Sequence, residues 1–197
     1  MSFVIGVDSS TQSCKVLARD LDTGDVISSA QQAHPDGTEV DPEHWWEALN
    51  AALGALDLPG RPEAVSVGAQ QHGLIALDHD GRVIRPALLW NDTRSAPQAH
   101  ALIEHFGQAN LAQGTGSVPV ASFTVTKLLW MRENEPDLAR KVAAVALPHD
   151  WLTWRLRGFG PPEQSPLGPE LDQLTTDRSD ASGTGYFNAS TNEYELD

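Results

Sequence analysis

The sequence has a single cysteine, few basic residues and no long apolar run. Cys14 is the only cysteine among 197 residues, which excludes an intrachain disulfide and a cysteine-based zinc site. No apolar run approaches the ~20 residues that cross a bilayer. The amino terminus has no basic stretch before its apolar residues and reaches Asp8 within a few positions, so we expect no signal peptide. We therefore expect a cytoplasmic protein in which Cys14 is a small core residue rather than a nucleophile.

Positive charge is also scarce. The chain carries 13 Lys and Arg against 27 Asp and Glu, for a formal net charge of -14. Such a surface repels phosphate backbones and anionic lipid, so we expect neither nucleic acid nor a membrane as a partner. The P-loop pattern Gly-x-x-x-x-Gly-Lys-Ser/Thr does not occur, which excludes that kind of nucleotide site. With 40% hydrophobic residues, the chain can bury one sizeable core or two small ones.

The first third of the chain predicts a three-strand meander followed by a helix. Short apolar segments separated by turn residues place strands at 3–7, 15–19 and 26–31. Asp41, Pro42 and Glu43 together are typical of a helix start, with an N-cap carboxylate, proline in the first turn and an early acid. Apolar residues then recur every three or four positions, so we expect this helix to pack on the meander.

The remaining two thirds alternate between strand and helix patterns. We expect a buried strand at 64–69, shorter strands at 74–77 and 142–147, helices at 98–106, 124–133 and 150–156, and an exposed loop or insertion at 158–169. In the helix at 124–133, Leu128, Leu129 and Met131 are predicted to point inward. This order of elements predicts an α/β fold with a mixed sheet flanked by helices.

A hydroxyl-rich turn follows the first strand. Residues 8–15 read Asp-Ser-Ser-Thr-Gln-Ser-Cys-Lys. The backbone N–H groups and hydroxyls of Ser9, Ser10, Thr11, Gln12 and Ser13 can donate to phosphate oxygens, Asp8 can hold a hydrated magnesium ion, and Lys15 can add a cation. The same residues also make an ordinary β-turn, and by itself this segment does not decide between the two interpretations.

Two further polar segments suit the hydroxyl groups of a sugar. Residues 70–73 read Gln-Gln-His-Gly at the end of a predicted strand, where amides and an imidazole can bind a polyol. Residues 90–94 read Trp-Asn-Asp-Thr-Arg, in which an indole can stack on a sugar and Asn91 and Asp92 can bind its hydroxyls. The structural alternatives are a satisfied histidine at a strand end, and a helix cap at Asp92 or Thr93 with Trp90 in the core.

Taken together and in this order, these segments resemble the FGGY family of carbohydrate kinases. Residues 4–16 are similar to the phosphate-binding opening of that family, 41–46 to its Asp-Pro-x-x-Trp-Trp helix start, 68–73 to the Gly-Gln-x-His-Gly strand of its xylulose-phosphorylating members, and 88–94 to its Leu-Trp-x-Asp-x-Arg segment. Residues 126–130, 147–152 and 179–184 continue the resemblance, which covers nearly the whole chain. Residues 177–184, which otherwise suggest a capped turn, would then form a second polar wall of a cleft.

The resemblance implies a ribonuclease H-like, actin-like ATPase domain and an ATP-dependent sugar kinase. It implies transfer of the γ-phosphoryl group of Mg-ATP to a ketose or polyol, most closely D-xylulose to D-xylulose 5-phosphate. Gln71, His72, Trp90, Asn91 and Asp92 would contact the sugar. Asp8, Ser9, Ser10, Thr11, Gln12, Ser13 and Lys15 would face the ATP phosphates, with Asp8 as the metal-binding residue.

Members of this family have two actin-like domains, and the resemblance places the whole chain, residues 1–197, in the first. The catalytic base and the adenine site belong to the second domain, so we expect this chain to be inactive by itself and to work with a separately encoded second half or a homodimer partner. Two alternatives remain open: a stand-alone sugar-binding or regulatory module without catalysis, and a fragment of an actin-like ATPase or chaperone.

Overall fold

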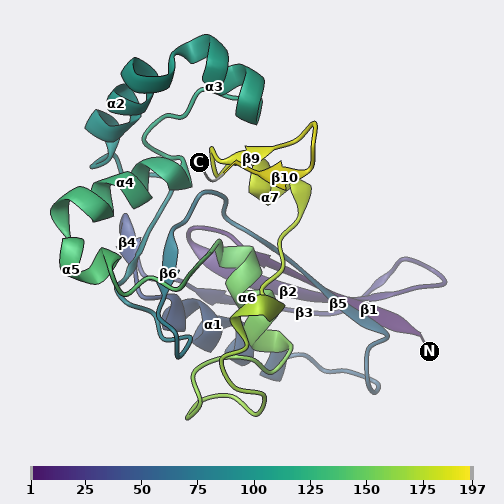
Figure 1. The fold of residues 1–197 in the computed structure, drawn as a ribbon. Helices are drawn as coiled ribbons and strands as arrows, with labels where there is room; N and C mark the ends of the chain where they lie inside the picture. The colour runs from purple at the N-terminus through teal and green to yellow at the C-terminus, as the bar shows by residue number, and fades with distance from the viewer. Residues whose placement is uncertain (1, 196–197) are drawn as a thin grey trace.

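A four-stranded sheet forms the base of the molecule, and the computed structural model describes residues 2–195 (Figure 1). Strands β1 (Phe3–Ser9), β2 (Ser13–Asp20) and β3 (Val26–Ala33) form an antiparallel meander. Strand β5 (Ala64–Ala69) pairs parallel with β1, which gives the order β3-β2-β1-β5. The predicted meander and the mixed sheet are confirmed.

Two helices cover one face of this sheet. Side chains alternate along β1 and β2, so that Ile5, Val7, Cys14 and Val16 are buried while Asp8 on the opposite face is exposed. Helix α1 (Pro42–Gly54) and helix α6 (Pro148–Leu156) pack into the same core through their tryptophan and leucine side chains. Asp41 caps α1 as predicted, because its carboxylate accepts a hydrogen bond from the Glu43 amide. Asp8 therefore lies on the face that these helices leave open.

The rest of the chain forms a helical layer beside the sheet, with short paired strands between them (Figure 1). These elements are β4 (Glu39–Val40) with β7 (Ala87–Leu88), β6 (Ile75–Leu77) with β8 (Ala144–Ala146), α2 (Ala96–Phe106), α3 (Gln108–Thr115), α4 (Thr124–Asn134) and α5 (Pro136–Ala139). The carboxyl-terminal segment adds η1 (Leu171–Gln173), α7 (Arg178–Ser182) and the hairpin β9 (Phe187–Asn188) and β10 (Glu193–Tyr194). Residues 158–169 form a loop without helix or strand, as expected, while the last two residues of the predicted domain lie outside the described part.

The prediction that residues 64–69 form a buried strand is half wrong. The strand exists as β5, but all of its residues are exposed or half-buried, and Val65 is 45% exposed. Within the described residues β5 is an edge strand, paired on one side only with β1. An apolar segment alone predicts the strand but not how many neighbours cover it.

The orientation predicted for the helix at 124–133 is also wrong in part. Met131 is buried in α4, but Leu128 and Leu129 are half-buried and line surface hollows. The other deeply buried positions of α4 are polar, Thr124, Thr126 and Lys127. They face main-chain carbonyl groups, which accept their hydrogen bonds and make the burial tolerable.

Candidate functional site

The turn after β1 is held in place from three directions. The Ser10 amide and hydroxyl both donate to the Ser13 carbonyl, at 3.0 and 3.1 Å. The buried His34 ring lies with Nδ1 2.9 Å from the Ser10 carbonyl, and its own amide donates to Gln12. Sequence analysis missed His34, because nothing in the pattern places the end of β3 under this turn.

The turn leaves donors available at its tip. The amides of Thr11 and Gln12 donate to no acceptor within residues 2–195. Asp8 and Lys15 are paired directly across β1 and β2, so their exposed side chains extend from the same face of the sheet beside this tip. Of the other predicted phosphate ligands, Ser9 is buried, and the Ser13 hydroxyl accepts from Gln31 at 2.8 Å.

A second loop, residues 70–73, leaves the sheet beside this turn. The Gln70 amide donates to the Ser9 carbonyl at 3.0 Å, which joins the two segments directly. The side chain of Gln70 is buried in the wall of the cleft, and its Oε1 has no hydrogen-bond partner among the described residues. Gln70 stands in the motif that pointed to Gln71 and His72, and sequence analysis did not select it.

Trp90 lies against the turn after β1. Its indole Nε1 donates to the Thr11 hydroxyl at 2.9 Å, although the side chain is 46% exposed. The alternative that placed Trp90 in the core is therefore wrong. An exposed indole fixed by its only polar atom offers a rigid apolar face to the cleft.

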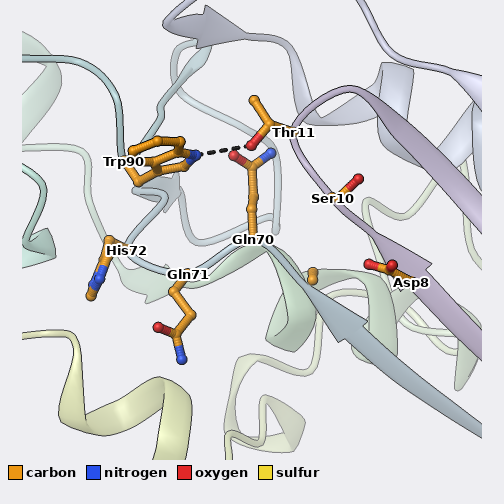
Figure 2. A pocket seen from close by; sticks show the side chains of 8 residues that line it. Asp8, Ser10, Thr11, Gln70, Gln71, His72 and Trp90 are labelled. Atoms are coloured by element: carbon orange, nitrogen blue, oxygen red, sulfur yellow. Dashed lines mark hydrogen bonds between the residues drawn. The ribbon is translucent and has the colours of Figure 1, made fainter.

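Together these segments enclose an open cleft of about 390 Å³. It is lined by Asp8, Ser10, Thr11, Ala69, Gln70, Gln71, His72 and Trp90. Figure 2 shows Gln70 reaching up between Trp90 and Thr11, Asp8 at the far end, and Gln71 and His72 directed down toward the carboxyl-terminal segment. The turn after β1 and the loop at 70–73, which are far apart in the sequence, thus line one concave surface together with the Trp90 ring.

Asn91 and Asp92 lie behind the cleft rather than in its lining. The buried Asp92 carboxylate accepts from Thr38 Oγ1 at 2.8 Å and from Arg94 Nε at 2.9 Å. Burial alone would raise the pKa of Asp92, but these hydrogen bonds outweigh it and hold the pKa below its usual value. Neither Asp92 nor Thr93 caps α2, whose N-cap is Ser95.

The Arg94 side chain continues into a partly buried ionic chain. It contacts Glu39 at 2.6 Å, Glu39 contacts Arg85 at 2.5 Å, and Arg85 reaches Glu135 at 3.1 Å. Both guanidinium groups lie over the Trp130 ring, with 5.0 and 5.5 Å to its centroid. These contacts fix Arg94 and, through it, Asp92, which lies two residues after Trp90.

The segment around α7 lies against Gln71 and His72, which form the lower wall of the cleft. Gln71 Nε2 donates to Ser179 Oγ at 3.3 Å, and His72 Nδ1 lies 2.8 Å from the Gly183 carbonyl. Residues 177–184 form the capped turn that sequence analysis offered as one interpretation, since the Asp177 carboxylate accepts from the Asp180 amide. They contact Gln71 and His72, but none of them lines the cleft, so the interpretation of this segment as a second polar wall stays a prediction.

Cation binding at Asp8 would depend on ligands beyond the protein. Within residues 2–195, ligand atoms of three His, Cys, Asp or Glu residues gather in only one place, at His149, Asp150 and Asp180, away from the cleft lining. Asp8 is exposed and offers a single carboxylate to the cleft. This fits magnesium, which keeps several waters and is commonly held by one or two carboxylates and substrate phosphates.

Comparison with known proteins agrees with this geometry. The sequence profile of the FGGY family of carbohydrate kinases, N-terminal domain, matches residues 3–197. A xylulose kinase of Streptomyces rubiginosus is 50% identical over 98% of this chain, and one of Streptomyces coelicolor is 52% identical over 98%. The crystal structure of xylulose kinase from Bifidobacterium adolescentis superimposes with a TM-score of 0.93 at 47% identity, covering 98% of this chain and 41% of that one.

The fold is therefore the actin-like, ribonuclease H-like fold of sugar kinases, and the expected fold class is confirmed. The chain belongs to the FGGY family of carbohydrate kinases and matches its N-terminal domain. It spans 38% of the length of the two Streptomyces relatives. No helix in the described part of the chain is long and apolar enough to cross a membrane.

Proposed function

We propose that the protein to which residues 1–197 belong transfers the γ-phosphoryl group of ATP to D-xylulose, giving D-xylulose 5-phosphate. The observation that carries this proposal is the single cleft shared by the Asp8–Thr11 turn, the loop at 70–73 and Trp90. The 50% identity to a xylulose kinase over nearly the whole chain supports xylulose as the sugar.

The two ends of the cleft have different chemistry. The amides of Thr11 and Gln12 and the Ser10 hydroxyl suit phosphate oxygens, while Lys15 supplies a positive charge nearby. At this end Asp8 would hold magnesium, which neutralises phosphate charge when bound. At the other end Gln71 and His72 present amide and imidazole groups to sugar hydroxyls, and Trp90 presents its ring face.

Asn91 and Asp92 belong to the proposed sugar site as supports of Trp90. The general base and the adenine site are assigned, by family resemblance, to a second domain or a separately encoded half. A homodimer partner is the alternative to a separately encoded half, and a cytoplasmic location, where ATP is available, is part of the same proposal.

The test measures sugar binding to residues 1–197 by calorimetry, and compares D-xylulose with D-ribulose, gluconate and glycerol. We expect D-xylulose to bind best, and His72→Ala to weaken its binding about tenfold, since a hydrogen bond contributes roughly 1 kcal/mol or more. The exposed residue His100 on α2 provides the matched control, because His100→Ala changes a histidine outside the cleft. Equal affinity of the parent and His72→Ala for D-xylulose would remove the loop at 70–73 from the sugar site.

A further inference from the structure

Lys127 is a fully buried lysine that no catalytic or binding assignment above uses. Its side chain extends from α4, is 0% exposed, and donates from Nζ to the His72 carbonyl at 3.1 Å and to the Ser122 carbonyl. No carboxylate of the described residues lies within ion-pair distance of it. Burial lowers its pKa to about 7, partly offset by the charge of Asp92. Both the ammonium and the neutral amine retain enough N–H donors for these two carbonyls.

The carbonyl that Lys127 holds belongs to a residue in an unusual conformation. His72 has φ of 66°, and only Asn192 shares a positive φ among the non-glycine residues described. A left-handed conformation is uncommon for a non-glycine residue, although His adopts it more readily than most, and surrounding contacts stabilise it. Lys127 and the Thr124 hydroxyl, at 3.3 Å, both bind the His72 carbonyl and so supply such contacts.

This backbone conformation decides which way the imidazole faces. The ring stacks on Phe123 with 5.0 Å between centroids, and Nδ1 lies 2.8 Å from the Gly183 carbonyl. A carbonyl only accepts, so Nδ1 carries the hydrogen and donates it. Burial lowers the pKa of His72, which favours the neutral ring. Nε2 is then an unprotonated acceptor, and no described residue donates to it.

We propose that Lys127 is a positioning residue: through the His72 carbonyl it holds the imidazole with Nδ1–H on Gly183 and with Nε2 free to accept a hydrogen bond from a sugar hydroxyl. The last clause rests on the proposed function, whereas the geometry of Lys127, His72 and Gly183 does not. A sugar O–H donating to a fixed nitrogen lone pair gives both affinity and orientation.

The first test measures the histidine itself, without sugar. Long-range ¹H–¹⁵N correlation spectra of the parent chain, with His72 assigned through His72→Gln, should show Nδ1 protonated and Nε2 unprotonated. Lys127→Met removes the two hydrogen bonds donated by Nζ and keeps nearly the same side-chain length. In this variant the His72 signals should change to those of a mixture of tautomers. Lys141→Met is the matched control, because Lys141 is exposed and outside the cleft, and its spectrum should keep the parent tautomer.

Two results would overturn the proposal: a parent His72 protonated at Nε2, or a folded Lys127→Met variant whose His72 signals equal those of the parent. A parent His72 protonated at Nε2 would overturn the proposal even if Lys127→Met does not fold. A second test uses D-xylulose as the probe: Lys127→Met should weaken its binding about tenfold, whereas Lys141→Met should keep the parent affinity. Equal weakening in both variants would also contradict the proposal. If the parent binds no D-xylulose while the tautomer result holds, the proposed function fails and the positioning by Lys127 stands.

Discussion

At the scale of single residues, the contact between His72 and Gly183 sets the shape of the lower wall. Gly183 has an ordinary negative φ, so backbone freedom does not require glycine there. A methyl group at this position would instead lie closer than 3.0 Å to the imidazole of His72. Gly183 is thus required for space, because the ring must approach the main chain to reach its carbonyl.

Gly183→Ala should therefore displace the His72 ring while leaving the fold intact. We expect D-xylulose affinity to fall about tenfold, because displacing a binding group by a fraction of an ångström loses its hydrogen bond. Calorimetry measures the affinity and thermal unfolding checks the fold. Gly114→Ala in α3 is the control, since a Cβ there meets nothing within 4 Å. Unchanged sugar affinity in Gly183→Ala would show that the ring position does not matter for binding.

The sequence predicts a site residue when the short segment around that residue already indicates its chemistry. Asp8, Thr11, His72 and Trp90 stand in short polar segments at strand ends, and the structure brings all four to one cleft. Their supports are remote in sequence: His34 lies under the first turn, and Lys127 is 55 residues from the carbonyl that it holds. A lysine within an amphipathic helix pattern predicts a solvated side chain, so its burial could not be inferred without the fold.

At the scale of elements, an ionic cluster joins α6 to α7. His149 Nδ1 lies 3.0 Å from an Asp150 carboxylate oxygen and 3.1 Å from one of Asp180. The adjacent carboxylates of Asp150 and Asp180 raise the pKa of His149 to about 10, against the opposing effect of burial. The imidazolium therefore bridges the helix of the core to the segment that supports Gln71 and His72.

The stability that this cluster contributes should depend on pH. The folded pKa of His149 lies above its unfolded value of 6.5, so the contribution is complete below pH 6.5 and is lost progressively up to about pH 10. Against the parent, His149→Gln should cost roughly 2 kcal/mol at pH 6, the range for hydrogen bonds to charged groups, and progressively less toward pH 9. Urea unfolding of both proteins from pH 6 to 9 measures this difference.

Taking the difference between the two proteins removes other groups that titrate in this window. Lys127, with a pKa lowered to about 7, makes the folded state more stable as pH rises, which opposes His149 in the parent alone. Burial and the charge of Asp8 raise the pKa of Cys14 to about 11 from an ordinary value of 9.0. Cys14 therefore changes the pH dependence of stability only above about pH 9.0. A cost of His149→Gln that stays constant from pH 6 to 9 would show that folding does not raise the pKa of His149.

Elements were predictable where their signals are local and strong. The cap at Asp41 and the apolar spacing after it define α1, and the turn residues between β2 and β3 define the meander. The two-residue strands β4, β7, β9 and β10 have no periodicity of their own, since their pairing is fixed by the fold around them. The open edge of β5 was missed for the same reason, because coverage is a tertiary property.

At the scale of the whole molecule, the distribution of charge matters more than its sum. A net charge of -14 opposes anion binding over most of the surface. The cleft offers main-chain amides and hydroxyls at the β1 turn, and Lys15 lies beside them. Neutral donors in a fixed turn bind phosphate without the need for a strongly basic surface.

The same cleft lacks a carboxylate suited to take a proton from the sugar. Asp8 lies at the phosphate end, and Asp92 is bound by Arg94 and Thr38, which hold its pKa below the usual value and make it a weak base. Phosphoryl transfer also needs the nucleotide to be held from both sides. Under the proposed function, both arguments predict that the described residues position substrates without completing the reaction.

Residues 1–197 alone should therefore give no measurable ATP-dependent phosphorylation of D-xylulose, while retaining affinity for the sugar. A polypeptide extended to the full length of the Streptomyces relatives, of which this chain spans 38%, should be active. A coupled assay for ADP release with D-xylulose measures both. A trace of host kinase is excluded by repeating the assay with His72→Ala, because a contaminant would not respond to that change. Turnover by residues 1–197 that His72→Ala abolishes would contradict the prediction and would require the base to lie among the residues described, with Asp8 the first carboxylate to replace.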